Sequence, residues 1–311
     1  METVAVVLDQ PRRISVRKLA LNPVGADDVV IDVDWSGIST GTEKLLWSGR
    51  MPSFPGMGYP LVPGYESVGR IVDAGANAAY RIGETVFIPG ATCFKDARGL
   101  FGGAAGRLVA PSPRAIAIPE RLGARGVLIA LAATAYHALD GGAPPELIIG
   151  HGVLGRLLAR LTIATGAPAP TVWEVDPQRR GGGAGYTVID PEDDERSDYA
   201  TIYDASGAGQ LLDTFVTRLM KGGEVVLAGF YEGQLSFAFV PAFMREMRLR
   251  VAAEWRPEDL RAVNAMLRLG NLSLDDLITH QEAPDTAATA YAAAFTDSAC
   301  LKMVLDWRHC A

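Results

Sequence analysis

The chain has 311 residues, a formal net charge of −7 and a sequence pI near 5.2. Its 49% hydrophobic and 21% charged residues are typical of a folded protein with room for two domains. The acidic charge argues against nucleic acid as the main partner, because phosphate binding needs a basic face. The start lacks the regions of a signal peptide, and the longest apolar stretch, 127–139, is too short to span a bilayer. We expect a cytoplasmic protein without a transmembrane segment.

The cysteines are Cys93, Cys300 and Cys310, an odd number without CxxC spacing. This spacing argues against a disulfide framework and against a metal site built from thiolates. It is typical of a protein in a reducing compartment.

The first third of the chain predicts a β-rich module. Its short segments, rich in β-branched residues, are separated by Gly and Pro, which favours a barrel or sandwich over a helix bundle. The predicted strands are Thr3–Leu8, Ile14–Arg17, Val29–Val33, Ser67–Val72, Thr85–Ile88 and Arg107–Ala110.

From about residue 124, strands and helices alternate, the pattern that builds a parallel sheet with right-handed crossovers. The predicted strands are Leu147–Gly150, Thr171–Asp176, Thr187–Asp190, Ala200–Ala205, Glu224–Gly229 and Leu249–Ala252. The predicted helices are Leu154–Thr165, Gly209–Met220, Val240–Met247 and Pro257–Gly270. The apolar tail Cys300–Trp307 has β character. We expect an α/β protein with a β-rich domain 1–125, to which 254–311 returns, and a doubly wound domain 126–253.

The segment 147–155 reads LIIGHGVLG, a short apolar run that opens into Gly-x-Gly-x-x-Gly. In a dinucleotide-binding turn, Gly150 lets the chain turn off a strand and Gly152 lets backbone amides approach a pyrophosphate. Gly155 then lets the next helix pack closely on the sheet. The helix N-terminus offers N–H groups and a partial positive charge to the phosphates. An ordinary glycine-rich turn between a strand and a helix is the alternative.

Asp176 closes the next predicted strand about twenty residues after the last glycine, where an acid holds the adenosine ribose hydroxyls. A carboxylate there repels a 2′-phosphate and favours NAD. Arg179 and Arg180 lie just beyond and can pair with a phosphate, which keeps NADP open. Glu174 is the ribose contact if the strand ends earlier. His151 occupies the variable position of the glycine loop, and we expect it to face solvent.

A β-rich module followed by this nucleotide fold resembles the medium-chain dehydrogenase/reductase superfamily, in which a GroES-like domain accompanies a Rossmann domain. The phrases that carry the resemblance are SGISTGTE at 36–43, VPGYESVG at 62–69, GETV at 83–86, DASG at 204–207 and KGGEVVLAGF at 221–230. The resemblance implies that the segments after two of the sheet strands line the nicotinamide. The cofactor-binding residues expected in all are Gly150, Gly152, Val153, Leu154, Gly155, Asp176, Ala205, Ser206, Gly207, Gly229 and Phe230.

Three longer phrases look like one family within that superfamily, the bacteriochlorophyllide a dehydrogenases. They are WSGISTGTEKLLWSGR at 35–50, PGMGYPLVPGYE at 55–66 and GLFGGAA at 99–105. The tail at 300–307 fits that family as well. The resemblance implies oxidation of the 3-(1-hydroxyethyl) side chain of a bacteriochlorophyllide to a 3-acetyl group, with NAD as acceptor. This is a late step of bacteriochlorophyll a synthesis.

Zinc-dependent relatives in the superfamily have a cysteine in the first phrase, a histidine in a Gly-His-Glu phrase, and a further cysteine or acid. The matching positions here hold Ser39, Tyr65, and Ala132 or Ala133. Hydroxyl, phenol and methyl groups do not make a zinc site. The structural zinc lobe needs several closely spaced cysteines, and its region offers only Cys93. We expect no catalytic and no structural zinc.

Without zinc, we expect the conjugated macrocycle of the substrate to delocalise the positive charge that develops as hydride leaves, and a polar relay to take the proton. The candidate relay residues are Ser39, Thr40, Thr42, Tyr65 and Glu66, with Glu43 and Lys44 behind them. The candidates for stacking on the macrocycle are Trp47, Phe54, Tyr59 and Phe101. Each has a plain structural alternative. Thr42 and Glu43 suit a helix start, Glu66 suits a buried arginine or backbone amide, and loop aromatics commonly fill a core.

Two other functions stay open at this point. A zinc-free quinone or enone reductase keeps the fold but usually prefers NADPH, and Asp176 counts against it. A non-catalytic nucleotide-binding scaffold also retains the glycines and the ribose acid. By analogy with the superfamily, a homodimer through the sixth strand of the nucleotide domain, Leu249–Ala252, is possible.

Overall fold

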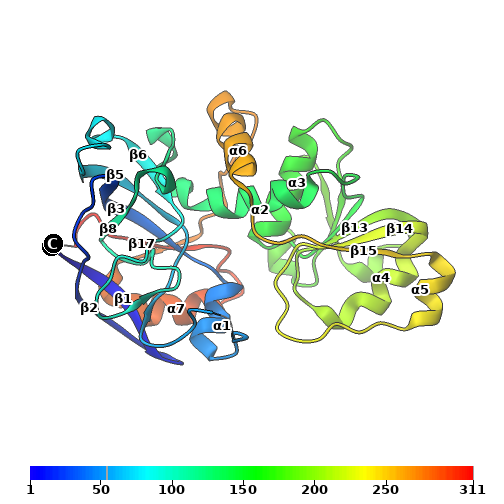
Figure 1. Ribbon diagram of the computed structural model, residues 1–311. Helices are drawn as coiled ribbons and strands as arrows, with labels where there is room; N and C mark the ends of the chain where they lie inside the picture. The colour runs from blue at the N-terminus through cyan, green and yellow to red at the C-terminus, as the bar shows by residue number, and fades with distance from the viewer. Residues whose placement is uncertain (54, 311) are drawn as a thin grey trace. The chain divides into compact units, whose positions relative to one another are not determined.

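The computed structural model describes residues 1–53 and 55–310. Contacts divide the chain into two compact units, Met1–Ala130 with the residues from Leu277 onward, and Leu131–Asp276 (Figure 1). We call them unit 1 and unit 2, and each is described by itself. Residues 254–276, which the sequence assigns to the first domain, group with unit 2 in this division.

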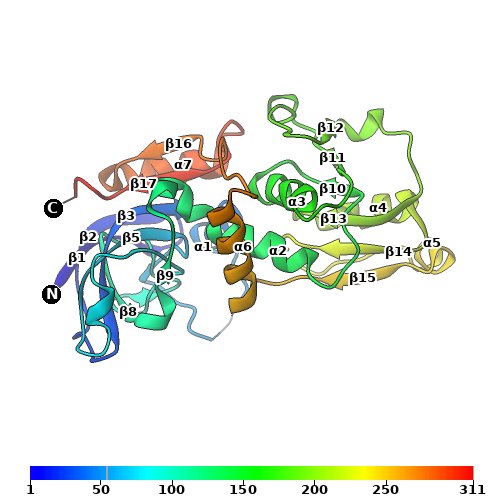
Figure 2. The ribbon, with the colours of Figure 1, turned by 90° about the horizontal axis from the view of Figure 1, so that it is seen from above.

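Unit 1 is rich in β-strands. Its strands are β1 (Glu2–Gln10), β2 (Arg13–Ala20), β3 (Asp28–Ile38), β4 (Leu61–Val62), β5 (Ser67–Ala74), β6 (Thr85–Ile88), β7 (Arg98–Gly99), β8 (Arg107–Pro111), β9 (Ile116–Ala117), β16 (His280–Glu282) and β17 (Met303–Asp306). They form sheets of order β2-β1-β4-β7 and β16-β17-β3-β5-β6-β9, with β8 also paired to β3. The tail strand β17 runs antiparallel beside β3 (Figure 2), so the C-terminal segment completes the sheet of unit 1.

The α-helices of unit 1 are α1 (Thr42–Ser48) and α7 (Ala287–Thr296). Helix α7 is not among the predicted elements, because its alanine-rich sequence has no polar face that marks a helical period. Its buried residues nevertheless recur at helical spacing, and they are Ala287, Ala290, Tyr291, Ala294 and Phe295. This face belongs to the main hydrophobic core of the unit.

One segment of the described chain, Glu120–Leu139, is long and apolar enough to cross a membrane by length and composition, and 56% of its window is buried. Its backbone is not one continuous helix, because Gly123 has φ 50° and ψ −134°. The α-helix α2 covers only Ile129–Leu139, 11 residues. Such a helix is about 16 Å long, well short of the roughly 30 Å hydrocarbon core of a bilayer.

Unit 2 is a parallel sheet with helices. Its strands are β10 (Leu147–Ile149), β11 (Thr171–Trp173), β12 (Thr187–Ile189), β13 (Tyr199–Asp204), β14 (Leu219–Leu227) and β15 (Arg248–Val251), and its further helices are α3 (Val153–Ala164), α4 (Leu212–Arg218), α5 (Phe239–Arg245) and α6 (Pro257–Leu269). The strand order is β12-β11-β10-β13-β14-β15. Figure 1 shows α3 on one face of the sheet and α4 with α5 on the other. This is the doubly wound Rossmann order, which reverses between β10 and β13. Folds of this order bind their ligands at the carboxyl ends of the strands beside the reversal.

Many predicted element limits differ from the structure by a few residues. For two of them the contacts give the reason. The predicted helix Gly209–Met220 ends at Arg218, because Leu219 already has an extended backbone and pairs with Tyr199 in the sheet. The predicted strand Thr171–Asp176 ends at Trp173. The second difference matters for function, since it changes which acidic residue stands directly after the strand.

Hydrogen bonds attach α6 and the segment after it to unit 2. The Asp259 carboxylate on α6 lies 2.9 Å from Nδ1 of His137 on α2. A guanidinium nitrogen of Arg160 on α3 donates to the carbonyls of Ser273 and Asp275 at 3.0 and 2.8 Å. These bonds explain why residues 254–276 group with the sheet domain.

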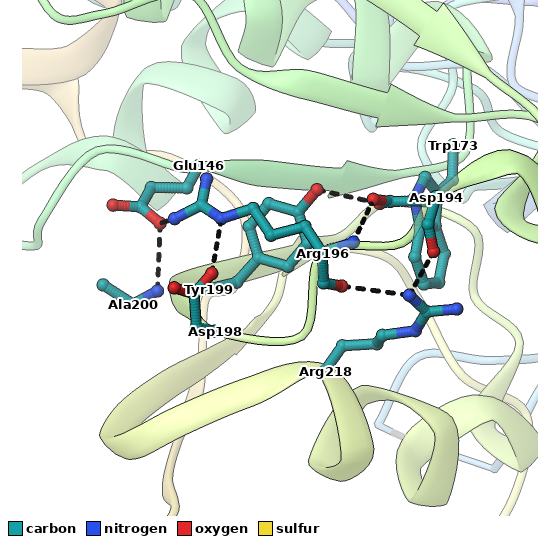
Figure 3. A network of polar contacts seen from close by, with 8 residues as sticks. All are labelled: Glu146, Trp173, Asp194, Arg196, Asp198, Tyr199, Ala200 and Arg218. Atoms are coloured by element: carbon teal, nitrogen blue, oxygen red, sulfur yellow. Dashed lines mark hydrogen bonds and ion pairs between the residues drawn. The ribbon is translucent and has the colours of Figure 1, made fainter.

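A polar network fixes the loop between β12 and β13 (Figure 3). The buried Asp194 carboxylate accepts from Trp173 Nε1 at 2.6 Å and from the Tyr199 hydroxyl at 2.8 Å. The Arg218 guanidinium at the end of α4 donates to the carbonyls of Asp194 and Arg196. Burial acts to raise the pKa of Asp194, but the hydrogen bonds that its carboxylate accepts from the Arg196 amide, Tyr199 and Trp173 outweigh it, and the pKa is lowered. The network anchors Trp173, the last residue of β11.

Candidate active site

The glycine loop after β10 has the geometry that the motif predicts. Gly150 has φ +93°, a conformation that L side chains rarely adopt. A Cβ on Gly155 would meet the Gly150 carbonyl oxygen at 1.9 Å, so only glycine lets α3 pack this closely. A Cβ on Gly152 would meet nothing within 4 Å, and no side chain caps α3 there. The loop therefore leaves open space beside uncapped helix N–H groups, which include those of Val153 and Leu154, and this fits a pyrophosphate.

The loop after β13 lies against the glycine loop, and the loop after β14 lies against the loop after β13. A Cβ on Gly150 would meet the backbone of Ser206 at 3.3 Å, and a Cβ on Gly229 would meet the backbone nitrogen of Gly207 at 3.1 Å. The amide of Ala205 donates to the carbonyl of Ile149, the last residue of β10, at 2.9 Å. The structure thus brings together the glycine motif and the segments expected at the nicotinamide. Phe230, the last of them, is 53% exposed.

Asp204, at the end of β13, ties these two loops together. One carboxylate oxygen accepts from the amide of Ser206 at 2.8 Å and from its hydroxyl at 2.5 Å. The other accepts from the hydroxyl of Tyr231 at 2.6 Å. Burial raises the pKa of Asp204. Asp204 and Tyr231 are site-building residues missing from the sequence-based candidates, although Asp204 is the first residue of the DASG phrase and ends a strand, which was a usable signal.

The two acids that follow β11 have different surroundings. Glu174 is buried, and its two carboxylate oxygens accept from the amides of His151 and Asp176, each at 3.0 Å. Asp176 instead begins a short 3₁₀ turn, where its carboxylate accepts from the amide of Gln178 at 2.9 Å. Because β11 ends at Trp173, Glu174 is the acid directly after the strand and the one in contact with the glycine loop.

The sequence predicts that His151 faces solvent, and this prediction is wrong. The side chain is fully buried. Its Nδ1 lies 2.7 Å from the carbonyl of Arg179, and its Nε2 lies 2.9 Å from the hydroxyl of Tyr186. A carbonyl only accepts, so Nδ1 carries the proton and Nε2 accepts from the tyrosine. Burial lowers the pKa of His151 to about 4. The segment 179–186 covers the loop, which the local motif could not reveal.

Arg180, one of the two arginines considered for NADP, is held within the protein. It forms an ion pair with Asp190, and its Nε donates to the carbonyl of Glu174 at 2.8 Å. A second guanidinium nitrogen donates to the carbonyl of Val175 at 3.0 Å. These bonds hold the Arg180 guanidinium against the backbone that follows β11.

Unit 1 brings three of the candidate hydroxyls together. Ser39, after β3, is buried, and its Oγ lies 2.7 Å from the hydroxyl of the half-buried Tyr65. Thr42, at the start of α1, also hydrogen-bonds that hydroxyl. Burial, helped by the nearby Glu66 carboxylate, raises the pKa of Tyr65. Thr40 is exposed and takes no part in this group. Ser39, Thr42 and Tyr65 form a hydrogen-bonded cluster of three hydroxyls, and each hydroxyl can donate to and accept from an alcohol.

Glu66 forms a buried ion pair with Lys302 from the C-terminal tail, with side-chain exposures of 0% and 2%. Gly37 makes room for the pair, because a Cβ there would lie 2.2 Å from a Glu66 oxygen. Burial raises the pKa of Glu66 and Lys302 opposes that rise. Lys302 was not among the candidates, and the predicted structural alternative for Glu66 named an arginine as its partner.

The candidate aromatic residues have protein partners of their own. Trp47 packs against Phe295 of α7 with ring centroids 5.5 Å apart. The hydroxyl of Tyr59 donates to the carbonyl of Leu46 at 2.5 Å. Phe101 packs edge-on against Tyr65, with ring centroids 5.4 Å apart, so this candidate contacts the cluster of hydroxyls. Phe54 lies outside the described residues.

The side chains at the zinc-ligand positions do not fit the metal. Ser39 and Tyr65 are bonded to each other, and Ala132 and Ala133 are buried methyl groups of α2. Among the described residues, no group of three or more His, Cys, Asp and Glu side chains is placed to hold a metal ion. The donor chemistry is that of a hydrogen-bonding site.

Comparisons with known proteins agree with this fold. Residues 25–120 match the alcohol dehydrogenase GroES-like domain. A short chain alcohol dehydrogenase from Escherichia coli CFT073, solved with NADH, has a TM-score of 0.84 at 19% identity, covering 98% of this chain and 99% of that one. A putative zinc-binding dehydrogenase from Sinorhizobium meliloti 1021, bound to NADP, has a TM-score of 0.84 at 20% identity with the same coverage. The fold is thus that of the medium-chain dehydrogenases/reductases.

Full-length relatives narrow the class. The 2-desacetyl-2-hydroxyethyl bacteriochlorophyllide A dehydrogenase of Rhodobacter capsulatus is 58% identical, and that of Cereibacter sphaeroides 56%, each over 99% of both chains. The chain belongs to the bacteriochlorophyllide a dehydrogenase family.

Proposed function

We propose that the protein oxidises the 3-(1-hydroxyethyl) group of a bacteriochlorophyllide to a 3-acetyl group, with NAD as hydride acceptor and without zinc. The observation that carries the proposal is the Ser39–Tyr65 hydroxyl pair at 2.7 Å, in the place where zinc-dependent relatives have metal ligands. The names of the full-length relatives support the hydroxyethyl pigment as substrate.

The chemistry divides into a hydride and a proton. A bound nicotinamide supplies the hydride acceptor. Ser39 and Tyr65 hold the substrate hydroxyl and relay its proton to water, each hydroxyl donating its own proton as it accepts the next. General acid–base help of this kind contributes roughly a hundred- to ten-thousandfold in rate. The carbinol carbon is attached to a conjugated macrocycle, which stabilises positive charge as the hydride leaves. This stabilisation reduces the need for a metal that acidifies the alcohol.

The choice of NAD is supported by the surroundings of Glu174. Its carboxylate stands against the glycine loop, where it accepts from ribose hydroxyls and repels a 2′-phosphate. The Arg180 guanidinium, one of the two that could pair with a 2′-phosphate, is paired with Asp190. We assign the ribose contact to Glu174. Asp176 instead stabilises the turn that follows, through the Gln178 amide.

The quaternary structure and location belong to the proposal as well. Strand β15 is the edge of the sheet in unit 2, and Val251 on it is 70% exposed. These features support a homodimer that joins two β15 edges.

Cys93 and Cys300 are buried free thiols, which supports a reducing cytoplasm.

A turnover assay tests the reaction. Purified protein is mixed with 3-hydroxyethyl bacteriochlorophyllide a and either NAD or NADP, and both reduced nucleotide and the long-wavelength pigment band are followed. We expect NADH and a red-shifted acetyl product to appear in equal amounts. Turnover of enones or quinones with NADPH instead would identify a reductase. Tight nucleotide binding without any turnover would identify a scaffold.

A further inference from the structure

A buried carboxyl group stands directly behind the hydroxyl pair. Glu43, in the first turn of α1, is 0% exposed. One oxygen accepts from the backbone amide of Ser39 at 3.0 Å, and the other accepts from the hydroxyl of Tyr291 at 2.8 Å. Tyr291 lies on α7 and is itself fully buried. Each oxygen of Glu43 therefore has its own donor, one from the loop that carries Ser39 and one from a distant helix.

The titratable groups that face Glu43 come from three other parts of unit 1. The charged groups are Glu66 next to β5 and Lys302 in the tail. The neutral titratable groups are the phenols of Tyr65 and Tyr291. The Lys302 ammonium is paired with Glu66. In the described part of the chain, no cation contacts Glu43. Hydrogen bonds rather than an ion pair thus oppose the effect of burial on its charged form.

At the described residues, the hydroxyls of Ser39 and Thr42 tie the loop between β3 and α1 to Tyr65, and the bond from the Ser39 amide to Glu43 holds the backbone of Ser39. Thr40 and Gly41 are exposed, and no side chain caps α1 at Gly41. The bond from the Ser39 amide to Glu43 therefore fixes the backbone from which the Ser39 hydroxyl reaches Tyr65.

We infer that Glu43 and Tyr291 are positioning residues for the Ser39–Tyr65 hydroxyl pair. Tyr291 orients the Glu43 carboxylate, the carboxylate holds the Ser39 backbone, and Ser39 thereby stays in register with Tyr65. The inference rests on the proposed alcohol oxidation, in which a small misplacement of the proton acceptor lowers the rate. No proton is assigned to Glu43 in the reaction itself.

A pH dependence follows from this arrangement. Burial raises the pKa of Glu43 to about 7, while the hydrogen bonds from Ser39 and Tyr291 act to lower it. The ionised carboxylate accepts at both oxygens, whereas protonation converts one oxygen into a donor. Oxidation should therefore weaken as the pH falls through about 7. Removing the Tyr291 hydroxyl should raise the pKa of Glu43 and move this loss of activity to higher pH.

Two nearly isosteric variants and a matched control separate the roles. Tyr291→Phe removes the donor to Glu43, and Glu43→Gln keeps an acceptor for the Ser39 amide but removes the charge. Tyr80→Phe is the control, because Tyr80 is 82% exposed. Hydrogen–deuterium exchange of the Ser39 amide and the pH dependence of kcat/KM are measured for each, with circular dichroism as the check of folding.

We expect Tyr291→Phe to speed exchange at Ser39 about five- to tenfold, the effect of losing one hydrogen bond, and to shift the acid limb upward. Glu43→Gln should keep the protection of Ser39 but abolish the acid limb. Tyr80→Phe should match the unmodified protein in both. Equal exchange in Tyr291→Phe and Tyr80→Phe, or an acid limb that survives Glu43→Gln, would overturn the inference. Absence of turnover in the unmodified protein would refute the proposed function, while the exchange data would still decide the inference.

Discussion

The assignment of the ribose contact to Glu174 can be tested by removing the charge of Glu174 and, as a control, that of Asp176. Glu174→Gln keeps the size of the side chain but removes its charge, and it turns an NH₂ group toward one of the two amides that Glu174 now accepts from. A hydrogen bond to a charged group contributes about 1.5–3 kcal/mol, or roughly ten- to a hundredfold in binding. We therefore expect the Kd for NADH to rise at least tenfold, while the Kd for NADPH changes much less.

Asp176→Asn is the matched control. Asp176 supports a short turn through the Gln178 amide, and asparagine can make the same bond. Its Kd for NADH should stay within about twofold of the unmodified protein. Fluorescence titration with NADH and NADPH measures both variants without any need for the pigment. Loss of NADH binding in Asp176→Asn together with normal binding in Glu174→Gln would refute the assignment and restore Asp176 as the ribose acid.

Three further predictions concern unit 2. Asp190→Ala should remove the ion pair of Arg180, while its bonds to the carbonyls of Glu174 and Val175 remain, and the unpaired guanidinium charge should tighten NADPH binding in the same titration. Unchanged NADPH affinity would show that Arg180 cannot reach the nucleotide. Asp194→Asn should lower the free energy of unfolding at pH 7 by about 1–3 kcal/mol, because two donors lose a charged acceptor. The pKa of Asp194 is lowered in the fold, so this difference should shrink in urea titrations as the pH falls below about 4. Val251→Lys should convert a dimer to a monomer in light scattering, and a variant that stays dimeric would rule out the β15 edge.

The sequence predicts the parts of the molecule that depend on local spacing. Gly150, Gly152 and Gly155 each have a role set by their own backbone, and the structure places them as the motif requires. The α/β class follows from strand and helix alternation, which is also a local pattern. The end of β11 was misplaced, because Glu174, Val175 and Asp176 continue the β texture although their side chains and amides already form a turn.

The rest of the site depends on contacts between distant segments. Tyr186 and the carbonyl of Arg179 bury His151 from about thirty residues away, so a motif read alone left that histidine in solvent. Tyr291 and Lys302 reach Glu43 and Glu66 only because the C-terminal segment returns to β3. No periodicity within the first hundred residues carries that information.

The central claim is that a hydroxyl pair replaces zinc in this dehydrogenase, and turnover of chelator-treated protein tests it most directly. The protein is stripped of metal and assayed with 3-hydroxyethyl bacteriochlorophyllide a and NAD, beside Tyr65→Phe, which loses the hydroxyl bonded to Ser39. The account predicts full activity after chelation and a fall in kcat of at least about a hundredfold in Tyr65→Phe, with NADH binding unchanged. Activity that disappears on chelation and returns with zinc, or a Tyr65→Phe variant with normal kcat, would contradict it.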